Sequence, residues 1–257
     1  MNVAQRVCIV TGGASGIGRA LCRRLAAEDA RVVVSDVDLA GAEAVAAEIG
    51  GVAFRADVAE ERDLASLIAQ VEQRVGPIDV FVSNAGIAIG GGPETPDAEW
   101  RRIMDINFMS HVWAARALVP VMLRRGSGYL VTVASAAGLL TQVGSAPYAV
   151  SKHAAVAFAE WLAVTYGDRG IRVSCVCPLG VRTPMLSFGD DRITALLSPE
   201  AISPEAVADA ILEGMAKEEF LILPHPQVRE FVARKADDRD RWIRGMQRLQ
   251  RRLEETP

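Results

Sequence analysis

Short runs of apolar, largely β-branched residues alternate along this chain with longer segments whose apolar positions recur at helical spacing. The runs predict strands at residues 6–11, 31–36, 52–55, 80–84, 129–133, 172–177 and 220–223. Most of them are apolar throughout, which is typical of parallel strands covered on both faces. The segments between them predict helices at residues 16–28, 39–49, 60–75, 96–125, 147–169 and 204–217.

Repeated strand–helix–strand units with short connections favour an α/β fold. We expect a single doubly wound parallel sheet of about seven strands with helices on both faces, rather than a closed barrel. Thr95-Pro96 and Ser203-Pro204 each predict a helix start, with a capping hydroxyl followed by proline at the first helical position. The 257 residues suit one domain, which we place at residues 1–226.

The remaining residues, 227–257, predict a charged amphipathic helical extension. Its apolar positions recur at spacings of four, three and four, and five arginines would form the solvated face. The apolar positions are Trp242, Met246, Leu249 and Leu253. Because so short a helix is marginal alone in water, we expect it to pack against its own domain or a neighbouring subunit. The alternative is a solvent-exposed, frayed helix.

The bulk properties narrow the range of partners. A formal net charge of −4 and a pI near 5.5 argue against nucleic acid as a main partner. No run of eighteen apolar residues occurs, so we expect no membrane span, and no signal-peptide core precedes the first strand. The four cysteines and three histidines lack metal-ligand spacing, so we expect reduced core cysteines, no metal and a cytoplasmic location.

A glycine-rich loop, TGGASGIG at residues 11–18, joins the first strand to the first helix. Such glycines let the backbone approach a pyrophosphate, which the N–H groups and dipole of the helix N-terminus can bind. The spacing is Gly12-x-x-x-Gly16-x-Gly18, and the loop alone is also compatible with a plain structural turn. The sequence therefore predicts a dinucleotide site here, to be judged with the rest of the pattern.

Asp36 ends the second strand, eighteen residues after Gly18. A carboxylate there can accept hydrogen bonds from the adenosine ribose hydroxyls and repels a 2′-phosphate. Neither Ser15 nor Val37 supplies a cation for such a phosphate. We therefore expect NAD rather than NADP, the alternative being that Asp36 is only a turn residue.

Further along, Asn84-Ala85-Gly86 follows the fourth strand, Ser135 follows the fifth, and Tyr148 and Lys152 form a Tyr-x-x-x-Lys pattern. With the glycine spacing, these motifs resemble the short-chain dehydrogenase/reductase family in its single-domain form, over about residues 5–223. The resemblance implies a Rossmann fold and, as the catalytic set, Asn107, Ser135, Tyr148 and Lys152. It implies cofactor contacts from Gly12, Ser15, Gly16, Ile17, Gly18, Asp36, Asp57, Val58, Asn84, Ala85, Gly86, Tyr148, Lys152, Pro178, Val181 and Thr183.

Two positions depart from the family pattern. Ser83 stands where many relatives carry asparagine, and Leu179 stands where the family has glycine directly after the proline. Gly180 follows one position late. We therefore expect a slightly different backbone path past the nicotinamide, although Val181 and Thr183 keep the matching positions.

Tyr148 and Lys152 lie four residues apart on a predicted helix and hence on one face. A free tyrosine has a pKa of about 10, and a nearby ammonium lowers it by about 1–3 units, which would suit a general acid or base. By resemblance, Lys152 also holds the nicotinamide ribose, Ser135 binds the reacting oxygen, and Asn107 positions a water in a proton relay. Taken singly, each residue has an ordinary structural explanation, and only their combination points to chemistry.

The resemblance implies an NAD(H)-dependent oxidoreductase that interconverts a secondary alcohol and a ketone, in a homodimer or homotetramer. Epimerase or dehydratase chemistry and a catalytically silent NAD-binding regulator remain as alternatives. Residues 90–93, 136–143 and 185–188 are expected to face the substrate, and they offer no cation. We therefore expect an uncharged, largely apolar substrate under a lid that contains Met185, Leu186, Phe188, Ile193, Leu196 and Leu197; the alternative is a lid that only packs on its own domain.

Overall fold

A computed structural model of the chain describes residues 1–187 and 191–255. Its centre is a seven-stranded, all-parallel sheet in the order β3-β2-β1-β4-β5-β6-β7. The strands are β1 (Val7–Thr11), β2 (Arg31–Asp36), β3 (Val52–Arg55), β4 (Ile78–Ser83), β5 (Gly128–Val133), β6 (Ile171–Val176) and β7 (Leu221–Ile222). The predicted fold class is confirmed. The order reverses at β1, which pairs with β2 on one side and β4 on the other.

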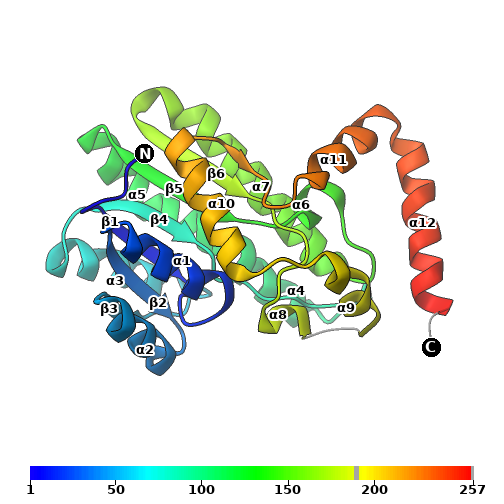
Figure 1. Ribbon diagram of the computed structural model, residues 1–257, viewed down its shortest axis with the longest axis horizontal. Helices are drawn as coiled ribbons and strands as arrows, with labels where there is room; N and C mark the ends of the chain where they lie inside the picture. The colour runs from blue at the N-terminus through cyan, green and yellow to red at the C-terminus, as the bar shows by residue number, and fades with distance from the viewer. Residues whose placement is uncertain (188–190, 256–257) are drawn as a thin grey trace.

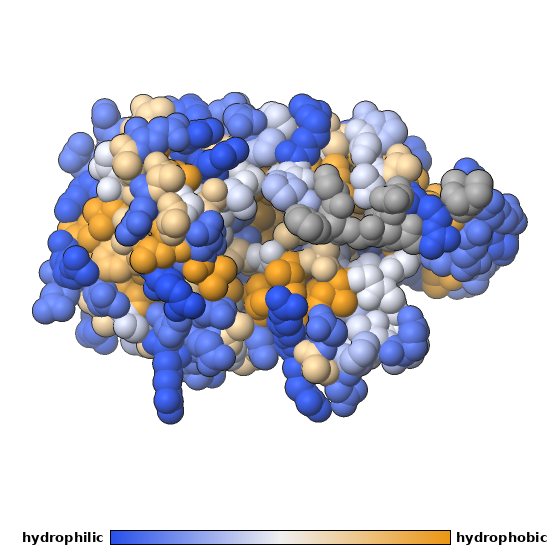
Figure 2. Space-filling model, turned by 90° about the horizontal axis from the view of Figure 1, so that it is seen from below, coloured by the Kyte–Doolittle hydropathy of each residue, from blue (hydrophilic) through white to orange (hydrophobic). Residues whose placement is uncertain are grey.

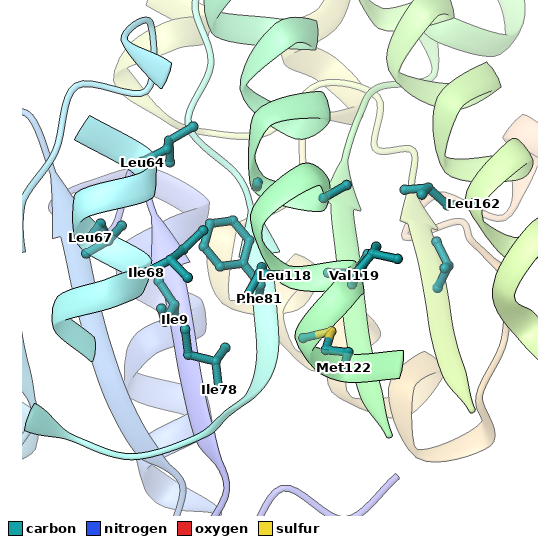
Figure 3. Packing of buried hydrophobic residues seen from close by; sticks show 14 of the residues in the cluster. Ile9, Leu64, Leu67, Ile68, Ile78, Phe81, Leu118, Val119, Met122 and Leu162 are labelled. Atoms are coloured by element: carbon teal, nitrogen blue, oxygen red, sulfur yellow. The ribbon is translucent and has the colours of Figure 1, made fainter. Parts of the chain in front are cut away.

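Helices cover both faces of this sheet (Figure 1). One face packs against α1 (Gly16–Ala27), α2 (Leu39–Ile49) and α10 (Pro204–Lys217). The other packs against α3 (Glu61–Arg74), α5 (Ser110–Arg125) and α7 (Ala146–Tyr166). Figure 3 shows the second core, where Ile68 of α3 and Leu118 of α5 lie on either side of Phe81. The two apolar cores hold the sheet rigid, so that its carboxyl edge can position polar groups.

The long helix predicted at residues 96–125 is interrupted. It consists of α4 (Asp97–Met104), a π-helical turn at Asp105–Met109, and α5. It also begins one residue later than expected: Pro96 occupies the N-cap position, and the Thr95 hydroxyl donates to the Gly90 carbonyl instead of capping the helix. Ser203 does cap α10, by accepting a hydrogen bond from the Ala206 N–H. A π-helical turn often marks a functional position, and this one contains Asn107.

The C-terminal segment forms two helices, α11 (Gln227–Asp237) and α12 (Arg239–Glu255), which we call the C-terminal arm. α11 lies on the body: Val228 is fully buried and packs with Ala136 and Leu140. α12 has no buried residue and extends away from the sheet (Figure 1). From below, the arm is mainly hydrophilic, with a smaller hydrophobic area beside the body (Figure 2). The predicted packing therefore holds for α11 and only in part for α12.

Two further observations concern partners. Within the described residues, the continuous helical segment 97–125 is the one segment long and apolar enough to span a membrane by length and composition. This segment packs on the sheet and on α7, as a core helix does, which agrees with the expectation of no membrane span. That expectation stays a prediction. Residues 1–187 and 191–255 contain no group of three or more metal-ligating side chains. All four cysteines are buried and free.

Candidate active site

The glycine-rich loop closes tightly onto the start of α1. Gly12 has a φ of 65°, and a Cβ on Gly18 would lie 2.0 Å from the Gly12 carbonyl oxygen. No side chain fits at position 18, so the first turn of α1 approaches the end of β1 by backbone alone. A Cβ on Gly16 would lie 3.2 Å from the Thr183 side chain, so the loop also faces residues 178–183. This cradle of backbone N–H groups fits a pyrophosphate.

Asp36 is held beside that loop. Its carboxylate accepts hydrogen bonds from the Ala14 N–H at 3.0 Å and the Asp38 N–H at 3.0 Å. Each oxygen keeps acceptor capacity, because a carboxylate offers about four lone-pair sites. The side chain therefore lies where a ribose next to the pyrophosphate would meet it. Asp57 is also oriented by its backbone, since its Oδ1 accepts from the Ala59 N–H at 2.9 Å, next to the buried Val58.

Asn84 braces the two central strands. Its Nδ2 donates to the Thr11 carbonyl at 2.8 Å and to the Gly12 carbonyl at 3.2 Å. The N–H groups of Asn84 and Ala85 both donate to the Thr11 hydroxyl, at 3.0 and 3.2 Å. Asn84 therefore fixes the glycine loop to the end of β4.

The catalytic candidates meet at the carboxyl edge of β5. Ser135 follows that strand, and its hydroxyl hydrogen-bonds to Tyr148 and accepts from the Ala137 N–H at 3.1 Å. Lys152 lies one turn along α7, with Nζ 5.7 Å from the centre of the Tyr148 ring. Three predicted residues from two separate segments, the end of β5 and the start of α7, thus converge on one point.

The electrostatics of this cluster differ from the sequence-based expectation. Burial raises the pKa of Tyr148, against a smaller lowering by its hydrogen bond with Ser135. Burial also lowers the pKa of Lys152 to about 8. The Lys152 ammonium donates to the Val133 carbonyl at 3.1 Å, so it is bound to the strand rather than to the phenol. For Tyr148 the direction of the pKa shift is thus opposite to the lowering that the sequence analysis expected from Lys152.

Asn107 is fully buried in the π-helical turn and clamps the backbone of Ile87. Its Oδ1 accepts from the Ile87 N–H at 2.9 Å, and its Nδ2 donates to the Ile87 carbonyl at 2.9 Å. A Cβ on Gly86 would lie 3.2 Å from Asn107 Oδ1 and 3.5 Å from Lys152 Nζ. The absence of a side chain at Gly86 therefore leaves the space between Asn107 and Lys152 that a relay water needs.

Ser151 and His111 are two further buried residues of this region, and the sequence analysis gave neither of them a functional role. Ser151 receives a hydrogen bond from Asn107 Nδ2 at 3.1 Å and donates to the Tyr148 carbonyl at 2.9 Å, linking the π-helical turn to α7. His111 is buried, both ring nitrogens lack a partner among the described residues, and burial lowers its pKa to about 3. Ser151 gave only one signal, its place within the Tyr-x-x-x-Lys segment.

The segment 178–183 shows why leucine replaces the usual glycine. The Leu179 N–H donates to Nδ1 of His225 at 3.1 Å, and the Leu179 side chain packs in the cluster with Val228 of α11. Gly180 is required instead, because a Cβ there would lie 2.7 Å from the Leu197 carbonyl oxygen. The Pro178 carbonyl accepts from the Ala136 N–H at 2.8 Å. Leu179 therefore links this segment to His225 and to α11, and the expected change of backbone path past the nicotinamide stays a prediction.

The remaining members of the predicted sites take ordinary places around this crevice. Val181 is buried and pairs with Ile202, and the Thr183 N–H donates to the Val181 carbonyl at 2.7 Å. Ser15 occupies the N-cap of α1 without a side-chain bond, and Ile17 packs at the edge of the first core.

The predicted lid forms α8 (Pro184–Ser187) and α9 (Asp191–Leu197). The Thr194 hydroxyl donates to the Leu186 carbonyl at 2.8 Å, which ties the two helices together. Met185 and Leu196 are 39% and 40% exposed, so part of the lid's apolar surface is not used inside its own domain. Phe188 lies outside the described residues.

Known proteins resemble this chain in sequence and fold. A family model described as short chain dehydrogenase matches residues 6–192. The 17-beta-hydroxysteroid dehydrogenase 13 of Rattus norvegicus is 34% identical over 220 residues, which cover 82% of this chain and 73% of that protein. The 1-deoxy-11-beta-hydroxypentalenate dehydrogenase of Streptomyces exfoliatus is 34% identical over 254 residues, covering 93% and 90%.

Solved structures give the same fold. A short-chain dehydrogenase/reductase from Burkholderia phymatum, solved in complex with NAD, superposes with a TM-score of 0.86 at 24% identity. The match covers 93% of this chain and 96% of that one.

Proposed function

Since this chain belongs to the short-chain dehydrogenase family, we propose that it interconverts a secondary alcohol and a ketone with NAD(H). Membership of this family makes it an oxidoreductase acting on hydroxyl or keto groups. We propose Tyr148 as its general acid and base. The observation that carries the proposal is the cluster of Ser135, Tyr148 and Lys152 at the edge of β5. Its place next to the glycine cradle gives one crevice both a dinucleotide site and a proton donor.

When bound, the nicotinamide supplies the hydride acceptor for oxidation and the hydride donor for reduction. In reduction the phenol of Tyr148 gives its proton to the carbonyl oxygen and becomes a phenolate; in oxidation the phenolate takes the proton of the alcohol. Ser135 donates a hydrogen bond to the same oxygen and stabilises the charge that develops there. Lys152, with a water held beside Gly86 by Asn107, would carry the proton onward.

NAD rather than NADP is the proposed cofactor. The support is Asp36, whose carboxylate is oriented by Ala14 and Asp38 at the ribose end of the cradle. A 2′-phosphate there would face a like charge.

The substrate we propose is largely apolar. The exposed apolar side chains of the lid, Met185 and Leu196, support this, and two relatives are named for a hydroxysteroid and a hydroxypentalenate.

The test is turnover of a panel of cyclic and acyclic secondary alcohols and ketones with NAD(H) and NADP(H). Tyr148→Phe should bind NAD about as well as the native protein in calorimetry, while turnover falls by about 10²–10⁴-fold. Native turnover in that variant would contradict the mechanism. NAD binding without any turnover would favour the silent regulator, and redox-neutral conversion would favour the epimerase or dehydratase.

A homo-oligomer formed through α5 and α7 is also part of the proposal. The outer face of α7 exposes Trp161 and Val164 to 52% and 81%, and the Trp161 ring stacks on Phe158. Sedimentation of Trp161→Glu should show a smaller species than the native protein, with Lys217→Glu, on an exposed site of α10, as control.

A cytoplasmic location is also part of the proposal, and the buried, free cysteines support it.

A further inference from the structure

A groove of about 400 Å³ lies between the C-terminal arm and the short helix α6 (Ala137–Leu140). The arm contributes most of its wall and the end of α6 contributes the rest. Its lining includes Leu140 of α6 and, from the arm, Lys235, Arg239, Trp242, Ile243 and Met246. None of the segments expected from the sequence to face the substrate includes the arm.

The groove is tied to the catalytic edge of the sheet. α6 begins two residues after Ser135, and Lys235 Nζ donates to the Leu139 carbonyl at 2.6 Å. Ser135 lies two residues before α6 and Thr141 directly after it, so the two residues flank a four-residue helix, which is about 6 Å long at 1.5 Å per residue. A molecule of steroid or fatty-acid length spans that distance from the reacting oxygen to the groove.

The lining combines an apolar surface with two cations and no acid. Leu140, Ile243 and Met246 supply apolar contact, while Lys235 and Arg239 stand four positions apart. Neither cation forms an ion pair within the described ranges 1–187 and 191–255. The neighbouring carboxylate of Asp238 accepts from the Arg241 N–H at 2.8 Å and caps α12 instead. The pKa of Lys235 is lowered by burial and by Arg239, as expected for uncompensated positive charge.

One further donor is left without an acceptor. The indole nitrogen of Trp242 is buried and has no hydrogen-bond partner among the described residues. Lys235 and Arg239 lie on successive helices on either side of Asp238, and the charge of Arg239 still lowers the pKa of Lys235. Because an orphaned buried donor also costs free energy, a molecule that brings acceptor oxygens would stabilise this surface.

We infer that the groove is an outer substrate subsite for an apolar molecule bearing a carboxylate. The apolar body lies on Leu140 and Met246, the carboxylate lies between Lys235 and Arg239, and the hydroxyl or keto end points to Ser135. Charge-assisted hydrogen bonds fix the anion, and apolar burial supplies the remaining affinity. The inference rests on the proposed function for the identity of the reacting end, and it replaces the uncharged substrate expected from the sequence.

The test uses binding of a molecule that cannot react, so it does not depend on turnover. Decanoate and decanamide are titrated into the full-length protein by calorimetry, together with Arg239→Gln and Arg244→Gln. Arg244→Gln is the matched control, because it removes the same charge from α12 outside the groove lining. We expect decanoate to bind at least tenfold more tightly than decanamide, and Arg239→Gln to remove that preference while Arg244→Gln keeps it.

Equal affinities for the two probes, equal effects of the two arginine variants, or no binding of either probe would overturn the subsite. A second readout is the tryptophan fluorescence change on decanoate binding, which should disappear in Trp242→Phe. Turnover of a small neutral ketone by Arg239→Gln should stay at the native level. Decanoate binding without ketone turnover would leave the subsite standing and refute the proposed reaction, whereas turnover without the charge preference would do the reverse.

Discussion

The N–H of Leu179 donates a 3.1 Å hydrogen bond to Nδ1 of His225, which is 2% exposed. This bond joins the segment expected to hold the nicotinamide to the start of the C-terminal arm. The same segment is bonded through Pro178 to Ala136, next to Ser135. A change at His225 therefore reaches the cofactor segment and the catalytic serine together.

Replacing His225 should disturb cofactor binding more than the chemical step. His225→Leu leaves the Leu179 N–H without an acceptor, at a cost of about 1–3 kcal/mol, and lets residues 178–183 shift. We expect KM for NAD to rise about tenfold with a smaller change in kcat. His225→Asn restores an acceptor oxygen near Nδ1 and should recover most of the affinity. If His225→Leu binds NAD as tightly as the native protein does, the hydrogen bond to His225 is not what positions residues 178–183. The contacts of Pro178 and Gly180 would then be sufficient.

We expect Lys152 to lower the free energy of unfolding of the native protein, although it serves catalysis. Its pKa falls from 10.5 to about 8 in the folded protein, so folding is opposed by the charged form below pH 8, and the penalty disappears as pH rises from about 8 to 10.5. Lys152→Met should therefore be more stable than the native protein at pH 7, by about 1–3 kcal/mol after the lost bond to Val133 is counted. It should also have almost no turnover.

Urea unfolding at several pH values checks this. The stability difference between Lys152→Met and the native protein should narrow steadily between pH 8 and 10. Lys217→Met, at an exposed position, is the control and should show no such trend. A difference that stays constant with pH would mean that the pKa of Lys152 is not lowered in the folded protein.

The sequence predicted the elements and most of the site, because both depend on local pattern. Strand runs and helical spacing recovered the sheet, and glycine, tyrosine and lysine stood at recognisable spacings. What it missed depends on contacts between distant residues. His225 and Leu179 are 46 residues apart, and the Lys152 bond to Val133 arises only when α7 lies on β5. The π-helical turn at Asn107 likewise leaves no mark in the periodicity of residues 96–125.

Cofactor preference should follow the charge of Asp36. Asp36→Asn keeps the shape of the side chain and removes the repulsion of a 2′-phosphate, so NADP should bind more tightly than it does to the native protein. Asp36→Ala also removes the acceptor for ribose hydroxyls and should weaken NAD by about tenfold, or 1.4 kcal/mol. Calorimetry of the native protein and the two variants with both dinucleotides measures the six affinities. Tighter binding of NADP than NAD by the native protein would contradict the assignment.

The two helices of the arm should contribute differently to stability. α11 buries Val228 against Ala136 and Leu140, whereas α12 has no buried residue. Truncation after residue 238 should therefore leave the melting temperature within a few degrees of the native value. Truncation before Gln227 exposes the cluster around Leu179 and should lower the melting temperature further. It should also weaken NAD binding, because residues 178–183 lose the support of α11.

Val228→Ala separates packing from chain length in that comparison. Deleting two buried methyl groups costs about 1–2 kcal/mol, which should reproduce part of the loss seen on truncation before Gln227. Ile243→Ala, on the 46%-exposed side chain of α12, is the control and should leave the melting temperature unchanged in the monomer. If both truncated proteins have the same melting temperature as the full chain, α11 does not support the cofactor segment. A loss already complete on removal of α12, together with a fall in mass by light scattering, would instead place α12 at a subunit interface.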